Sequence, residues 1–200
     1  MKNILMSMVF VVVAFCATNA WAGSSRTVTV NATVPTVAGG LTVEVSKVTG
    51  EDASGLGGVW TTASSISFGT LVWDSVNSIF LPDSYYAVDI GVLDNSGNAW
   101  TVTHSRQSLA NGANNLNDKV NVSFNKQTTK DTGIELSKFS FGNSNSKAFT
   151  KAQLTSGWLR VYYGIGTGNP LKPDASGVTP IGLDTPAGTY NGSITITLAP

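Results

Sequence analysis

Hydrophobic and polar residues alternate at both ends of the chain, over residues 27–34 and again over residues 190–198. A period of two puts the apolar positions on one face of an extended strand and the polar ones on the other. The apolar positions are Val28, Val30, Ala32 and Val34 in the first segment and Tyr190, Ile194, Ile196 and Leu198 in the second. Two such strands either close one sheet within the chain or join neighbouring copies into a fibre.

Further strand-like segments fill the middle of the chain, and each is bounded by Gly, Pro, Asn, Asp or Ser. Residues 74–84 and 105–118 are expected to be connections, and residues 150–154 a single helical turn capped by Thr150. Asp94 to Asn98 predicts a hairpin turn that pairs the strands on either side of it. The pattern predicts an all-β, antiparallel, immunoglobulin-like β-sandwich. The expected strands are 41–48, 60–73 with a bulge at Gly69, 85–93, 99–104, 119–125, 134–141 and 157–164.

The first 22 residues predict a secretory signal peptide rather than part of the fold. Lys2 precedes a short apolar stretch, and Ala20-Trp21-Ala22 fits a cleavage site for removal after Ala22. Residues 23–200 then form one domain, and Cys16, the only cysteine, is lost with the signal. The exported chain is therefore expected to fold without a disulfide, which leaves its stability to the core.

Charge and catalytic residues exclude several classes of function. Twelve basic and twelve acidic residues balance, so no excess of charge points to nucleic acid. His104 is the only histidine and has no evident orienting partner, and no nucleophile elbow, phosphate loop or dinucleotide motif occurs. Asp89 and Asp94 are a poor pair for sugar hydrolysis, since one is expected in a strand and the other in a turn. The sequence thus predicts a protein that is not an enzyme and uses no cofactor or metal.

Aromatic residues are the remaining candidates for ligand binding. In strands they either fill the core or, when they face outward, form a platform on which sugar rings stack. A secreted module that binds carbohydrate or a surface is therefore an alternative function. The candidates are Trp60, Trp73, Trp100, Trp158, Tyr85, Tyr86, Tyr162 and Tyr163.

Three short motifs, in order along the chain, carry a family resemblance. They are T-V-T-V-N-A-T-V at 27–34, F-G-T-L at 68–71, and P-A-G-T-Y followed by I-T-I-T-L within 186–198. Together they resemble the spore coat protein U-like family, which includes pilins of archaic chaperone–usher fibres. Members usually keep a cysteine shortly after the first motif, whereas this chain has Gly39, Gly40 and Leu41 there.

The resemblance implies a sandwich that lacks one strand and takes it from a neighbouring subunit. Residues 23–34 would supply the donor segment, with Val28, Val30, Ala32 and Val34 entering the neighbour's groove. Tyr190, Ile194, Ile196 and Leu198 would line one wall of the acceptor groove.

The expected function is a structural subunit of a bacterial surface fibre, coat or extracellular matrix. It would pass through the periplasm to the cell surface, with copies of itself, a periplasmic chaperone and an usher as partners, and surface glycans as a further candidate. The residues alone fit equally well an ordinary first strand, at 27–34, of a sandwich complete in itself.

Overall fold

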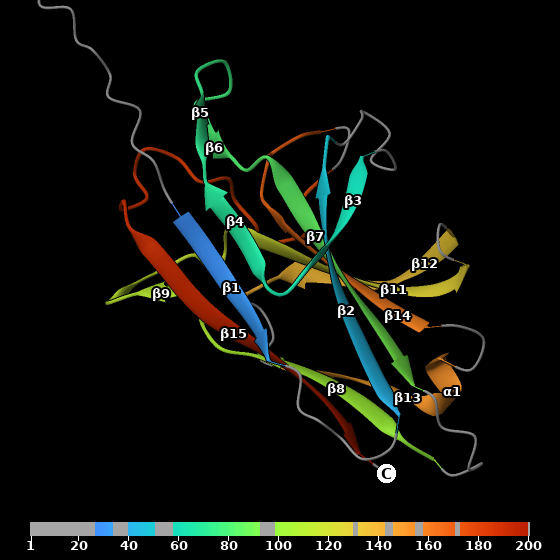
Figure 1. The fold of residues 1–200 in the computed structure, drawn as a ribbon. Helices are drawn as coiled ribbons and strands as arrows, with labels where there is room; N and C mark the ends of the chain where they lie inside the picture. Colours follow the sequence, from blue (N-terminus) through green and yellow to red (C-terminus); the bar gives the residue numbers. More distant parts are fainter. Residues whose placement is uncertain are drawn as a thin grey trace, which may run out of the picture.

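Two β-sheets lie face to face and enclose the core (Figure 1). The computed structural model describes residues 27–33, 40–50, 58–92, 99–129, 132–142, 146–154, 158–170 and 173–199, with residues 27–33 described by their backbone. The predicted signal peptide, Val34 and the predicted turn at 94–98 lie outside these residues. Among the described residues, no helix is both long enough and apolar enough to cross a membrane.

One sheet has seven strands and the other has six, and a separate two-stranded hairpin is formed by β5 (Val72–Asp74) and β6 (Ile79–Leu81). The seven-stranded sheet comprises β1 (Thr27–Thr33), β4 (Ile66–Thr70), β8 (Thr101–Arg106), β9 (Ala110–Asn111), β10 (Asn114–Asn115), β13 (Ser146–Thr150) and β15 (Thr189–Ala199). The six-stranded sheet runs in the order β12 (Thr132–Ser140), β11 (Val120–Thr129), β14 (Trp158–Ile165), β7 (Ser84–Val92), β2 (Leu41–Thr49) and β3 (Val59–Ala63). The predicted all-β sandwich is confirmed, and its strand pairs are antiparallel except for β1 with β15.

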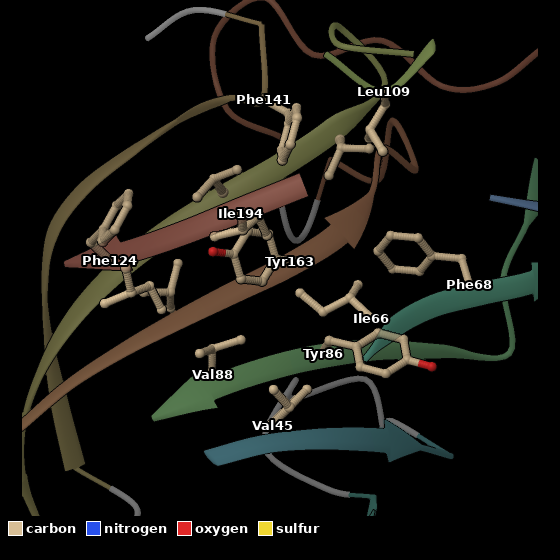
Figure 2. Close-up of a cluster of buried hydrophobic side chains, with 14 of the residues drawn as sticks. Val45, Ile66, Phe68, Tyr86, Val88, Leu109, Phe124, Phe141, Tyr163 and Ile194 are labelled. Atoms are coloured by element: carbon tan, nitrogen blue, oxygen red, sulfur yellow. The ribbon is translucent and has the colours of Figure 1, made fainter. Parts of the chain in front are cut away.

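The core is built by the alternation that the sequence shows. In β14, Leu159, Val161 and Tyr163 are fully buried, while the residues between them lie on the opposite face of the sheet. Figure 2 shows Tyr163 among core side chains from both sheets, including Ile194 of β15 and Val88 of β7. Full burial of one such aliphatic or aromatic side chain contributes about 1.5–3 kcal/mol, so a core of this size can stabilise a chain without disulfides.

One short helix, α1 (Lys151–Leu154), follows β13. The carboxamide oxygen of Gln153 accepts hydrogen bonds from the Thr150 N–H at 2.8 Å and the Thr150 hydroxyl at 3.2 Å. The predicted helical turn beginning at Thr150 is therefore confirmed. Its buried residue, Leu154, joins the core.

Three predicted connections between strands and one predicted strand were wrong. Strand β8 does not form a hairpin with β7, because β8 lies in the seven-stranded sheet and pairs with β15 and β13. The single strand expected over 60–73 is divided into β3, β4 and β5, which belong to three different sheets. The connection expected at 74–84 contains β6, and the loop expected at 105–118 contains the small β9–β10 hairpin. The predicted bulge is present, since Val28 pairs with Gly69 and Thr29 with Ser67, and Gly69 has a φ of 63°.

Candidate functional site

The amino-terminal strand β1 lies between the carboxyl-terminal strand β15 and strand β4 (Figure 1). It runs parallel to β15, from Thr27 opposite Thr189 to Thr33 opposite Thr195. On its other side it runs antiparallel to β4. We call this position in the sheet, between β15 and β4, the complementation slot. In the structure the slot is filled by the chain's own strand.

The two strands that flank the complementation slot contribute apolar side chains to the core. On β15, Tyr190, Ile194 and Ile196 are at most 1% exposed, and Leu198 packs against the core at its margin. The register sets Val28 opposite Tyr190, Val30 opposite Gly192 and Ala32 opposite Ile194. Since paired residues share a face of a sheet, these three β1 positions fall on the core side. On β4, the fully buried residues are Ile66 and Phe68.

Strand β15 is held firmly on its far side. Residues 194–199 pair with β8, and Asn191 pairs with Ala110 of β9. The Tyr190 hydroxyl donates a 2.7 Å hydrogen bond to the carbonyl oxygen of Pro186 and fixes the turn before the strand. Removal of β1 would therefore leave the β15 wall attached to the sheet and two strand edges facing each other, with unpaired backbone groups above apolar side chains. Such open edges are templates for pairing with another strand.

A second feature lies on the outer face of the six-stranded sheet, around Arg160. Its Nε and Nη2 donate to the two carboxylate oxygens of Asp89 at 2.6 and 3.0 Å. The guanidinium carbon lies 4.6 Å from the ring centre of Trp60 and 4.7 Å from that of Trp158. Arg160 is only 2% exposed, although its strand position faces away from the core. We call Trp60, Trp158, Tyr162 and Tyr85, together with Arg160, the aromatic face.

The ion pair with Asp89 keeps the guanidinium of Arg160 protonated at the centre of the aromatic face. Burial alone would lower the pKa of Arg160, but hydrogen bonds to Asp89 and to Tyr162 outweigh it and raise the pKa. The four rings are half-buried, and Tyr85 and Tyr162 contact each other with ring centres 6.1 Å apart. A guanidinium between two indoles is attracted by both ring faces, which holds the rings in fixed positions.

The other predicted platform aromatics are placed elsewhere. Tyr86, Tyr163 and Trp100 are buried in the core, and Trp73 packs against Phe80 of the β5–β6 hairpin, 4.8 Å between ring centres. The alternation W-x-R-x-Y at 158–162 does place three residues of the aromatic face on one side of β14. Arg160 was not among the sequence candidates, although this spacing was a readable signal for it.

His104 lies inside the core rather than at the surface. It is 1% exposed, and its Nε2 shares a 2.5 Å hydrogen bond with the Tyr163 hydroxyl. Burial, together with a smaller contribution from the nearby positive charge of Arg106, lowers the pKa of His104 to about 4. Arg106 is itself buried over the ring of Phe141, and its Nε and Nη2 have no hydrogen-bond partner among the residues that the structure describes. Within the described ranges, no three His, Cys, Asp or Glu residues come close enough together to hold a metal ion.

Comparison with models of protein families, with curated proteins and with solved structures gave no match. The resemblance to the spore coat protein U-like family thus rests on the three short motifs in the sequence.

Proposed function

We propose that this protein is a non-enzymatic structural subunit of a bacterial surface fibre, coat or extracellular matrix. Its subunits would assemble by exchanging strand β1, so that the complementation slot of one copy holds the amino-terminal strand of the next. The observation that carries the proposal is the place of β1, a terminal strand paired on both sides inside the sheet.

The position of β1 in the chain favours exchange. It precedes every other described strand, so it can leave the slot while the remaining strands keep their order. The sheet edges that it would expose gain backbone hydrogen bonds from any incoming strand, and the alternating apolar residues set its register. Exchange of an identical element between copies costs little, because the contacts formed are those that were broken.

The slot accepts a strand in either direction. Strand β1 is parallel to β15 and antiparallel to β4, so these two walls run in opposite directions. An inserted strand is therefore antiparallel to one wall whichever way it runs. The same backbone edges can thus be satisfied by the chain's own β1 or by one from a neighbour.

Composition and the predicted export signal agree with this role. Charged residues make up 12% of the chain, and the alternating part of the donor segment, residues 27–34, carries none. A strand without charges can be buried between two walls without a desolvation cost for ionised groups. The proposed route is through the periplasm, with a chaperone and an usher as partners, to the cell surface.

A cysteine pair across the slot tests the proposal. Thr29 of β1 lies opposite Ser67 of β4, and the exported chain is predicted to contain no other cysteine. Oxidation of the Thr29→Cys, Ser67→Cys variant should give a ladder of disulfide-linked multimers on a denaturing gel. The matched control, Thr103→Cys with Thr197→Cys, joins the neighbouring strands β8 and β15 of one chain. It should give only monomers with an internal disulfide. If the Thr29→Cys, Ser67→Cys variant also gave only monomers with an internal disulfide, β1 would occupy the slot of its own chain and the fibre proposal would fail.

The aromatic face supports a second candidate function, the binding of glycans at a cell or host surface. Its four half-buried rings lie on the outer face of the sheet, where stacking on sugar rings requires them. Titration of the exported protein with β-1,4-linked glucose and N-acetylglucosamine oligosaccharides, followed by tryptophan fluorescence, would test it. Trp158→Ala should abolish a fluorescence change that Trp73→Ala retains, because Trp73 lies in the β5–β6 hairpin. No change with the unmodified protein would remove this candidate.

A further inference from the structure

Strand β12 forms an open edge of the six-stranded sheet, and Figure 1 shows it across the molecule from β1. It is nine residues long and pairs with β11 on one side, and no strand in the described part of the chain pairs with its other side. A long unpaired edge presents a row of backbone donors and acceptors to solvent, and proteins usually protect such edges with proline, charge or a covering loop.

The β12 edge carries exposed apolar side chains beside its two charged residues, Glu135 and Lys138. Ile134 is 63% exposed and Leu136 is 39% exposed, and they are two of the few large hydrophobic residues at the described surface. Leu136 has no partner in β11, because the register shifts between Phe124 and Asn125. This bulge reverses the alternation of faces at the middle of β12.

The bulge makes the strand complementary to itself. Ile134 and Phe139 pair with Lys126 and Val122, which lie on the core side of β11. Glu135 and Lys138 are opposite Asn125 and Ser123, on the outer side. If two β12 strands lie antiparallel with Glu135 opposite Lys138, then Ile134 lies opposite Phe139, and each pair shares one face. By two-fold symmetry each pair occurs twice, which gives two apolar pairs and two pairs of opposite charge.

Both charges are already held at this edge. The Lys138 ammonium donates a 2.7 Å hydrogen bond to the Pro173 carbonyl oxygen and keeps two further donors. The Glu135 carboxylate accepts a 3.4 Å hydrogen bond from the Ser123 hydroxyl. Neither residue is paired with an ionised partner within the described chain, so a second copy can supply one.

We propose that β12 pairs with β12 of a second copy of this chain, antiparallel and edge to edge, so that the two six-stranded sheets continue into one another. The contact uses neither β1 nor the complementation slot, so it does not rest on the proposed function. In a fibre it would join chains side by side, and in a chain that keeps its own β1 it would form a closed dimer.

Charge reversal tests the register. In the exported protein, Glu135→Lys or Lys138→Glu alone places two like-charged pairs across the two-fold axis and should weaken the dimer about tenfold in sedimentation equilibrium. The double variant Glu135→Lys, Lys138→Glu restores opposite charges and should recover the original dissociation constant. Failure of the double variant to recover would overturn the proposed register.

A matched pair of exposed residues tests the location. Ile134 on β12 and Val59 on β3, at the opposite edge of the same sheet, are 63% and 65% exposed. Ile134→Lys should abolish the dimer and Val59→Lys should leave it unchanged. Leu136 lies beside the two-fold axis, so Leu136→Cys should form a disulfide-linked dimer and no larger species, more readily than Val59→Cys. Equal cross-linking of Leu136→Cys and Val59→Cys would contradict the edge-to-edge contact. If the Thr29→Cys, Ser67→Cys variant formed a ladder while Leu136→Cys formed no dimer, the chain would exchange β1 without making the β12 contact.

Discussion

The buried histidine makes the stability of this protein depend on pH in a way that can be measured cleanly. His104 is the only histidine in 200 residues, and it lies on the core side of β8 with 1% of its surface exposed. Its ring shares a hydrogen bond with Tyr163 and packs edge-on against Phe124, 5.0 Å between ring centres. Protonation of His104 in the folded state would bury an imidazolium charge beside the positive charge of Arg106.

The sign and size of the effect follow from the pKa. Burial lowers the pKa of His104 from 6.5 to about 4. Between these two pH values the unfolded chain binds a proton that the folded chain does not, so the free energy of unfolding falls as the pH is lowered. The slope reaches about 1.4 kcal/mol per pH unit, and the loss across the window amounts to about 3 kcal/mol. This contribution is fully present above pH 6.5.

Urea unfolding of the protein without residues 1–22 at pH 7 and pH 5, followed by tryptophan fluorescence, should show about 2 kcal/mol of this loss, because pH 5 still lies above the folded-state pKa of about 4. The comparison is with His104→Gln, which keeps a hydrogen-bonding group toward Tyr163 but cannot titrate. Carboxylates contribute equally to both proteins and cancel in the difference; one of them is Asp83, whose pKa is lowered by the hydrogen bond from Ser84. Parallel pH profiles for the two proteins would refute the reasoning, since they would show an imidazole that titrates alike in the folded and unfolded chains.

Further substitutions and a change of pH test other parts of the fold, each by the free energy of urea unfolding. Arg106→Met should raise it by about 1–3 kcal/mol, because two buried N–H groups without partners disappear, and a loss would show that the guanidinium is satisfied. Asp89→Asn should lower it by about 3 kcal/mol, since Arg160 would stay buried without its counter-ion, and an unchanged value would mean that the pair is solvated. Gly69→Ala should cost about 1–2 kcal/mol at a φ of 63°, and no cost would contradict the bulge geometry. Burial raises the pKa of Tyr163, so stability should decline as the pH rises above about 10, and Tyr163→Phe should flatten this decline.

Alternation in the sequence predicted the longer strands and their faces, but it did not reveal the short strands β6, β9, β10 and β13. In β7 the pattern assigned the residues to the correct faces, because side chains of a strand alternate with a period of two. The core face carries Tyr86, Val88 and Ile90, and the outer face carries Tyr85, Ala87 and Asp89. The strand boundaries at both ends of the chain also lie within a residue of the predicted ones. These features depend on local chemistry, which a sequence displays directly.

Pairing between strands was predicted less well, because it depends on contacts that are distant along the chain. The turn chemistry at 94–98 indicates a reversal, but it does not say which sheet the next strand enters. The β5–β6 hairpin had a readable signal, since the Asp74 carboxylate accepts hydrogen bonds from the N–H groups of Val76 and Asn77, at 2.9 and 3.3 Å. Aspartate at that position of a turn is a known signature, but strands of three residues are too short to show alternation.

The two candidate sites differ in how far a sequence could reveal them. The complementation slot was predictable as two alternating strands, but alternation is the same for a strand kept in its own chain and for one donated to a neighbour. The aromatic face brings Trp60 of β3 to Arg160 of β14, although β2 and β7 lie between these strands. The register places Ser46 and Ala87 on those intervening strands in line with Tyr162, and Ala87 is fully buried on a face that has no core. On β3 the same line reaches Thr62, and Trp60 lies one position further along that face, in line with Val48 and Tyr85. The contact of Trp60 with Arg160 therefore depends on the strand order and register, so W-x-R-x-Y could be joined to Trp60 only after these were known.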